Sequence, residues 1–122
     1  IEAVSLIGTV TDAVEANAGD DTDGGTTADV SITTVAANAW IVAGMTHYTT
    51  ATVTPVANFT ERAEIATANI LGAIGTREVV SPGATTVGWT WTGAADSSIV
   101  AGSFAPAVTA SAIRNLALLG VG

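Results

Sequence analysis

This chain could build a catalytic site from one histidine and eleven carboxylates, and it has no cysteine. A hydrolase needs a nucleophile, a base and an acid that orients the base. His47 is the sole histidine, and no G-x-S-x-G motif supplies a serine for it to activate. Glu61 and Glu64 have opposite parity on their expected strand, so they cannot form the paired carboxylates of a glycosidase. We therefore expect His47 to be a surface or strand-end residue, Glu61 to pair with Arg62 or Arg77, and the protein to have no enzyme activity.

The segment Asp20-Asp21-Thr22-Asp23-Gly24 is the candidate for a cation site. Its D-x-D-G core resembles part of a calcium-binding loop, in which alternate acids followed by glycine let the backbone wrap around a hard cation. The full loop needs a bidentate glutamate at its last position, where this chain has Ile32. We therefore favour a solvated acidic loop, with Asp21 and Asp23 as weak calcium candidates, and we predict no bound metal and no cofactor.

Trp89 and Trp91 lie on one face of an expected strand. Two such rings could form a flat platform for a sugar, as in a carbohydrate-binding module. We favour the alternative that both face inward as core anchors, each burying on the order of 200 Å². The chain has few other aromatic side chains, with one tyrosine, two phenylalanines and three tryptophans in all.

Asn58 begins the motif Asn58-Phe59-Thr60, which is an acceptor sequence for N-glycosylation. Such motifs also occur often by chance. Asn58 is therefore a candidate glycosylation site only if the source glycosylates its exported proteins.

Composition and charge exclude several classes of partner. The chain has 122 residues, of which 48% are hydrophobic and 11% charged, against a charged share of about 25% in typical domains. Its net charge is −8 and it contains no lysine, so it lacks the basic surface that nucleic acid or an anionic bilayer requires. No apolar run approaches the roughly 18 residues of a membrane-spanning helix. We expect no nucleic-acid binding and no membrane insertion.

Alternation of apolar and polar residues predicts about seven short strands, with turn signals about every ten residues. The strands are expected at residues 1–10, 29–35, 40–45, 59–66, 77–80, 85–92 and 97–104. Residues 11–27 read as a loop, 46–58 as an edge strand or loop, and Ser81-Pro82-Gly83 as a type II turn. The prediction is an all-β fold, an antiparallel, jelly-roll-like β-sandwich over residues 1–107. The extension at residues 108–122 fits either a short helix or a donor strand.

The expected core follows the large apolar residues on one parity of each strand. It comprises Val30, Ile32, Trp40, Val42, Ile65, Val87, Trp89, Trp91, Ile99 and Phe104. Two terminal segments remain apolar outside this core, and their candidate assembly residues are Val4, Leu6, Val10, Ile113, Leu116 and Leu119. One sandwich has few places to bury both segments, and soluble monomers seldom expose large apolar patches. We therefore predict that one segment packs against a neighbouring subunit or adds a strand to it.

Several segments of the sequence, taken together, resemble parts of a known type of module. They are residues 30–34, 38–44 and 81–91, together with Phe59-Thr60-Glu61-Arg62 and Phe104-Ala105-Pro106. Over residues 3–107 the chain resembles jelly-roll-like β-sandwich modules of phage and environmental surface proteins. The resemblance implies a non-enzymatic sandwich displayed on a particle or cell surface, and it transfers no catalytic residue. Such modules usually have further strands upstream and tend to end near the Phe-x-Pro, so neighbouring subunits are expected to complete this one.

These observations favour a structural protein of a repetitive surface assembly, above all a virion decoration or capsid-associated protein. Its location would be the virion surface or the extracellular space. Its partners would be copies of itself or another structural protein of the same assembly. A pilin-like subunit of an extracellular filament, joined by strand donation, is the alternative. A carbohydrate-binding module that uses the two neighbouring tryptophans is a third hypothesis.

Overall fold

The computed structural model describes residues 14–49 and 51–107, whose regular structure is entirely β-strand. The strands are β1 (Ala16–Thr34), β2 (Ala39–His47), β3 (Thr54–Pro55), β4 (Thr60–Ala66), β5 (Leu71–Val79) and β6 (Gly83–Phe104). They form an antiparallel sheet in the order β1-β6-β2-β5-β4, and β3 pairs with β6. The prediction of an all-β, antiparallel, sandwich-like fold is confirmed. Among these residues there is no helix that could span a membrane.

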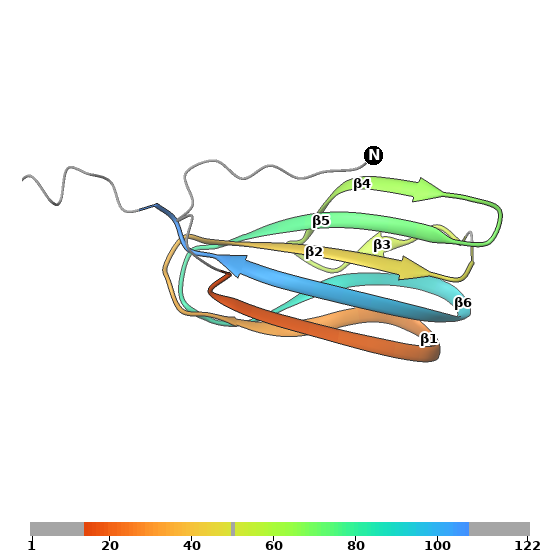
Figure 1. Cartoon of the computed structure of the whole chain (residues 1–122), viewed down its shortest axis with the longest axis horizontal. Coiled ribbons are helices and arrows are strands. Elements are labelled where there is room, and N and C mark those ends of the chain that lie inside the picture. Colours follow the sequence, from red (N-terminus) through yellow and green to blue (C-terminus); the bar gives the residue numbers. More distant parts are fainter. Residues whose placement is uncertain (1–13, 50, 108–122) are drawn as a thin grey trace, which may run out of the picture.

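β1 and β6 fold the sheet into two layers. They are 19 and 22 residues long, against a typical strand of about 5–6 residues. They pair along almost their whole length, but the register shifts between Thr22 and Thr27 of β1, where both strands fold back (Figure 1). Residues 16–22 and 97–104, with β2, β5 and β4, form what we call the large layer. Residues 27–34 and 83–90, with β3, form the small layer.

The predicted loop at residues 11–27 is wrong from residue 16 onward, because these residues belong to β1. β1 lies at the sheet edge and Asp20, Asp21 and Asp23 are exposed, so their charges remain in water and do not oppose a strand. At the bend, Gly24 has a φ of 64°. Its N–H donates to Oδ1 of Asp96 at 2.8 Å, so a side chain of β6 fixes the bend of β1.

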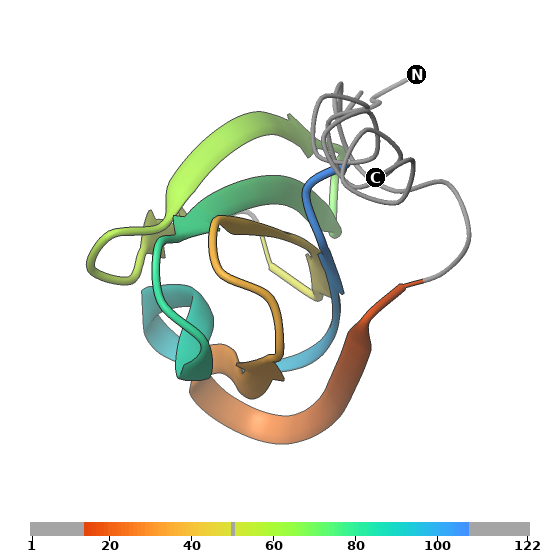
Figure 2. The ribbon, with the colours of Figure 1, turned by 90° about the vertical axis from the view of Figure 1, so that its left-hand side faces the viewer.

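The core lies between the two layers, which together enclose it in the end view of Figure 2. Six residues of the predicted core are confirmed, each no more than 7% exposed: Val30, Ile32, Val87, Trp89, Trp91 and Ile99. The large layer contributes further buried side chains, which include Ile41, Ala43, Met45, Leu71 and Ala73. Alternation of apolar and polar residues therefore located the core-facing side chains of the small layer, and fewer of those of the large layer.

On β2 the predicted inward parity is wrong. Ile41 and Met45 face the core, whereas Trp40 and Val42 are only half-buried on the other parity. Phe104, another predicted core residue, is half-buried beside Trp40 in the sheet register. β2 is apolar on both parities, so alternation alone cannot determine which one faces the core.

A β-bulge in β4 explains the wrong prediction for Ile65. The register with β5 shifts between Glu61 and Ala63, so Arg62 is an extra residue on the β4 side. One extra residue moves every later side chain to the opposite face. Ile65 is accordingly 54% exposed, and its Cγ2 lies 3.6 Å from the position that a β-carbon on Gly72 would take.

β5 begins at Leu71, well before the predicted strand at residues 77–80. Glycine in the interior of a strand normally argues against one. Here Gly75 has a packing role, because a β-carbon at this position would overlap the ring of Phe59. After β5, Gly83 starts β6 with a φ of 148°, a backbone conformation that favours the glycine of the predicted turn.

Candidate functional site

Trp89, in the centre of the core, makes a polar contact that the sequence analysis missed. Its Nε1–H donates to Oε2 of Glu61 at 2.8 Å. The ring of Phe59 meets the indole edge-on, with centroids 4.8 Å apart and planes at 85°. Glu61 precedes the bulge and shares the parity of Phe59, a signal that places it inward. Within the described residues the partner of Glu61 is thus Trp89 and not the predicted arginine.

The hypothesis of a sugar platform at Trp89 and Trp91 is wrong. Trp89 is 0% exposed and Trp91 is 7% exposed. The Trp91 ring also packs against His47, with centroids 4.6 Å apart. A sugar must reach a ring face to stack on it, and neither ring offers one. Their interpretation as core anchors is confirmed.

His47 ends β2 and is 0% exposed, so it is a strand-end residue but not a surface residue. Its Nδ1 accepts a hydrogen bond from the N–H of Thr49 at 3.0 Å. Within the described chain, its Nε2 has no partner, and neither have Nε1 of Trp91 and Oγ of Ser97. The register pairs His47 with Ser97, so these polar groups share one end of the core. A general base must reach a substrate proton, and this buried ring is not placed to do so.

The calcium candidates Asp21 and Asp23 are exposed near the bend of β1. Their neighbours make local contacts: Oγ1 of Thr22 donates to Oδ2 of Asp20 at 3.4 Å, and Asp96 accepts from the backbone of the bend. In residues 14–49 and 51–107, no three histidine or acidic side chains gather where they could hold an ion. The structure thus adds no support to a cation site here.

Glu15 is a second carboxylate with a structural role. Its Oε1 accepts a hydrogen bond from the N–H of Ala36, and its Oε2 accepts from Oγ of Ser103 at 3.2 Å. Its own N–H donates to the carbonyl of Ser103 at 2.7 Å. These bonds tie the start of β1 to β6 and to the connection between β1 and β2. Because Glu15 lay in a predicted loop, parity gave no signal for this role.

Asn58, the glycosylation candidate, lies in the turn before β4. It is exposed and has a φ of 62°. Phe59, inside the same motif, is 5% exposed, so the turn separates an accessible amide from a core side chain. Asn58 stays a candidate for modification.

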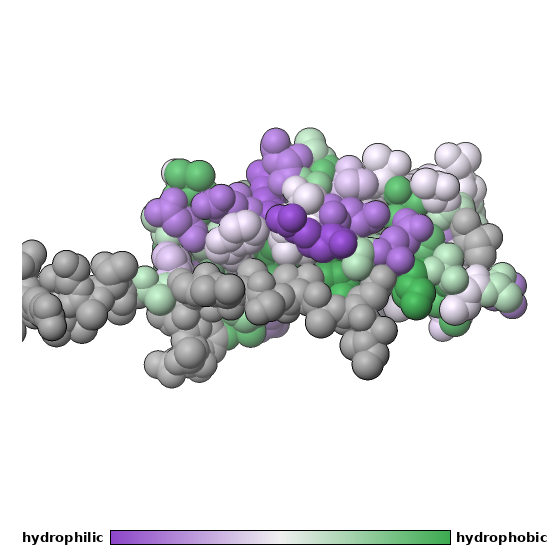
Figure 3. Space-filling model, turned by 90° about the horizontal axis from the view of Figure 1, so that it is seen from above, coloured by the Kyte–Doolittle hydropathy of each residue, from purple (hydrophilic) through white to green (hydrophobic). Residues whose placement is uncertain are grey.

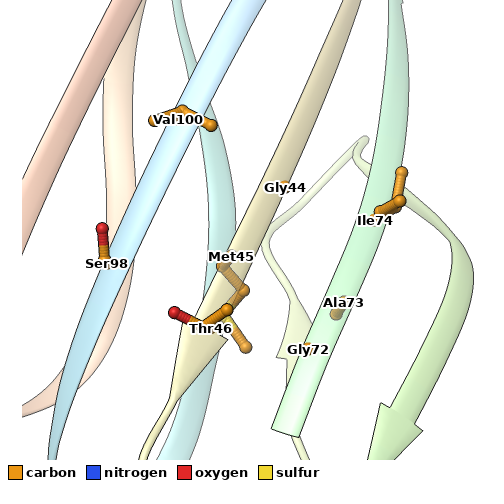
Figure 4. A pocket seen from close by; sticks show the side chains of 8 residues that line it. All are labelled: Gly44, Met45, Thr46, Gly72, Ala73, Ile74, Ser98 and Val100. Atoms are coloured by element: carbon orange, nitrogen blue, oxygen red, sulfur yellow. The ribbon is translucent and has the colours of Figure 1, made fainter. Parts of the chain in front are cut away.

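An apolar hollow of about 360 Å³ lies on the outer face of the large layer. Gly44 of β2 forms its floor, and Val100 of β6 and Ile74 of β5 stand on either side of it (Figure 4). Thr46, Gly72 and Ser98 complete the next row of side chains. No charged residue lines this hollow. We call it the outer groove.

Exposed apolar side chains also occur at both ends of the domain. Val35 and Val80, 71% and 69% exposed, follow β1 and β5, and the N–H of Asn38 bonds the carbonyl of Val80 at 3.1 Å. At the opposite end of β2 and β5, Tyr48 and Ile70 are 65% and 43% exposed and flank the pair formed by His47 and Leu71. We call these surfaces the valine end and the tyrosine end.

The outer face of the small layer has a different chemistry. Most of its exposed side chains are hydroxylic or acidic, and they include Thr27, Asp29, Ser31, Thr33, Thr86 and Thr90. None of the large exposed apolar side chains of the described residues belongs to this set. We call this surface the hydroxyl face, and it serves below as a reference for the apolar surfaces.

The edge formed by β4 carries exposed charged side chains. β4 is last in the sheet order, and Arg62 and Glu64 on it are exposed. Figure 3, which views the domain from this side, shows hydrophilic side chains gathered there with smaller hydrophobic areas alongside. Charged side chains on an edge strand oppose pairing with another chain.

No family model, curated protein or solved structure matches this chain. The resemblance to phage and environmental surface modules therefore stays a prediction. The assembly candidates Val4, Leu6, Val10, Ile113, Leu116 and Leu119 lie outside the described residues. The predicted helix or donor strand at residues 108–122 also lies outside them.

Proposed function

We propose that this protein is a non-enzymatic structural subunit of a repetitive surface assembly, in which copies contact one another end to end. The observation that carries this proposal is the position of the valine end and the tyrosine end at opposite ends of the same strands. Two different surfaces that bind each other form a heterologous contact, which repeats into a ring or a filament. Each end supplies the apolar centre of such a contact, and the polar residues around it supply the rim.

The remaining surface supports a binding role over a catalytic one. The one histidine is buried beside Trp91, and Glu61 is bonded to an indole of the core. Neither group is available to transfer a proton to a bound substrate. A hydrolase or a transferase would need such groups together in one exposed cleft.

Within this class, a virion decoration or capsid-associated protein is our first proposal. Support comes from the low share of charged residues, 11%, and from the resemblance described above. A pilin-like filament subunit is the second candidate, and its added strand would pair with the other sheet edge, β1, because the charged side chains of β4 oppose pairing there. A closed ring in electron micrographs would support the first candidate and a helical filament the second.

The end-to-end contact can be tested with two double variants. Val35→Asp/Val80→Asp places charges at the valine end, and Tyr48→Asp/Ile70→Asp places them at the tyrosine end. Thr86→Asp on the hydroxyl face adds a negative charge elsewhere and serves as the control. We expect both double variants to be monomeric in sedimentation experiments and the control to assemble as the native chain does.

Mixing the two double variants gives a sharper test. Each retains one intact end, so a mixture can form one heterologous contact and then stop. We expect dimers in the mixture and none in either variant alone. A native chain that stays monomeric at about 100 μM would contradict the proposal. Assembly of both double variants to the same extent as the Thr86→Asp control would contradict it as well.

A further inference from the structure

We infer that residues 1–10 of the same chain lie extended in the outer groove, above Gly44 and between Val100 and Ile74. This inference does not depend on the proposed function, since it concerns how one subunit covers its own surface. It makes the outer groove a binding site for a named segment.

The outer groove can accept side chains from above. The nearest atoms to a β-carbon at Gly44 would be the carbonyl oxygen of Ala73 at 3.9 Å and Cγ1 of Ile74 at 4.0 Å, so space remains over the floor. Val100 is 65% exposed at the rim. Covering apolar surface of this kind is favourable, because it removes that surface from water. The groove therefore favours an occupant with apolar side chains.

The chain before residue 14 starts beside this groove. Cγ1 of Val14 lies 3.1 Å from the position of a β-carbon on Gly102, and the N–H of Glu15 bonds the carbonyl of Ser103 at 2.7 Å. Gly102 and Val100 are on the same side of β6, about 7 Å apart. Val14 is thus held on the outer face at one end of the groove, and the segment that precedes it is tethered there.

The length of the preceding segment suits this site. Along β6 the distance from Gly102 to Ser98 is about 13 Å, and ten extended residues span about 33 Å. Residues 11–13 provide a connection of the length in which chains commonly reverse direction. Such a short tether gives an effective concentration in the millimolar range. This concentration favours the chain's own segment over that of a second copy.

The charge around the groove is compatible with this segment. Asp20 and Asp21 border a second hollow, which shares Ser98 and Val100 with the outer groove. An acidic occupant would be repelled there, and Glu2 is the only charged residue among residues 1–10. With Val4, Leu6 and Val10 in the groove, the opposite side of the segment would remain apolar and face outward.

Cross-linking tests the inference, since the chain has no cysteine of its own. Leu6→Cys/Val100→Cys places one thiol in the segment and one at the groove rim. Leu6→Cys/Thr86→Cys places the second thiol on the hydroxyl face as the matched control. With a short bifunctional maleimide, we expect an intramolecular product to form about tenfold faster in the first variant than in the control. Equal rates would overturn the inference.

A mixture of the two single variants, Leu6→Cys and Val100→Cys, separates one chain from two. We expect almost no cross-linked dimer in this mixture. A dimer that forms as fast as the intramolecular product would place the segment in a neighbouring copy, which overturns the inference and supports strand donation. Conversely, rapid intramolecular cross-linking in a chain that is always monomeric would support the inference and contradict the proposed function.

Blocking the groove gives a second readout. Gly44→Phe fills the floor from the solvent side, so the core is left intact. We expect thermolysin to cleave before Leu6 several-fold faster in this variant than in the native chain. Thr86→Phe is the control for a large apolar residue on the other face. Cleavage that Gly44→Phe does not change relative to this control would overturn the inference.

Discussion

The hydrogen bond between Trp89 and Glu61 makes the clearest quantitative prediction. The indole of Trp89 is 0% exposed. Its N–H donates at 2.8 Å to Oε2 of Glu61, the second residue of β4. Glu61→Ala leaves this N–H without a partner in the core. A buried donor without a partner costs about 1–3 kcal/mol, and more when the lost acceptor was charged. We expect Glu61→Ala to lower the free energy of unfolding by about 2–3 kcal/mol.

Three further variants separate the hydrogen bond from other effects. Glu61→Gln keeps an acceptor oxygen and should cost less than about 1 kcal/mol. Trp89→Phe removes the donor together with part of a fully buried ring, so it should cost about 3–5 kcal/mol. Glu64→Ala makes the same substitution at an exposed position of the same strand and should change stability by no more than about 0.5 kcal/mol.

Urea unfolding of the two single variants and the double variant completes a thermodynamic cycle. The expected coupling between Glu61 and Trp89 is about 1.5–3 kcal/mol, the range for a hydrogen bond to a charged group. Purely additive losses would refute the assignment of stability to this bond. A loss in Glu61→Ala equal to that in Glu64→Ala would do the same.

Three other predictions concern buried side chains and glycines. Ser97 and Ser103 are both buried, but only Oγ of Ser103 has a described partner. In urea unfolding, Ser103→Ala should lower the free energy of unfolding by about 1–2 kcal/mol and Ser97→Ala should leave it unchanged, and equal losses would contradict this. Gly88 and Gly93 both have positive φ, but a β-carbon at Gly88 would also overlap the carbonyl of Ala28. Gly88→Ala should thus lower the free energy of unfolding by at least about 2 kcal/mol more than Gly93→Ala, and equal urea midpoints of the two variants would show that the overlap is relieved. Trp91→Ala should lower stability by about 3–5 kcal/mol through lost burial and a cavity, and unchanged thermal unfolding would contradict its place in the core.

The sequence predicts this fold well where a strand is apolar on one parity. Val87, Trp89 and Trp91 alternate with threonines and Gly88, and the structure buries all three. β2 is apolar on both parities, so both choices of register look equally good in the sequence. Its inward face is decided by pairing with β5 and β6, which the sequence of β2 alone does not contain.

The site residues differ in how far the sequence reveals them. Glu61 could have been located, because it shares the parity of Phe59. Ile65 could not, because the bulge at Arg62 depends on how β4 pairs with β5. Burial of His47 follows from its packing against Trp91, a contact between residues far apart in the chain.

The bends of β1 and β6 explain another part of the difference. Residues 85–92 and 97–104 were predicted as separate strands, and both lie in β6. Gly24 and Gly93, which lie at the bends of β1 and β6, both have positive φ. A glycine in a sequence marks a change of direction, but it does not determine whether the strand pairing ends there or continues around a bend.

The connections between the two layers relate the fold to the proposed assembly. At the valine end, Val35 and Val80 lie where the chain crosses between the layers, from β1 to β2 and from β5 to β6. At the tyrosine end, Tyr48 begins the path from β2 to β3, and its N–H bonds the carbonyl of Asp96 at 3.0 Å. A contact made at either end would therefore rest on segments that join both layers. In an end-to-end assembly, each contact would stabilise the junction of the layers as well as the bond between neighbours, which couples folding of the subunit to its assembly.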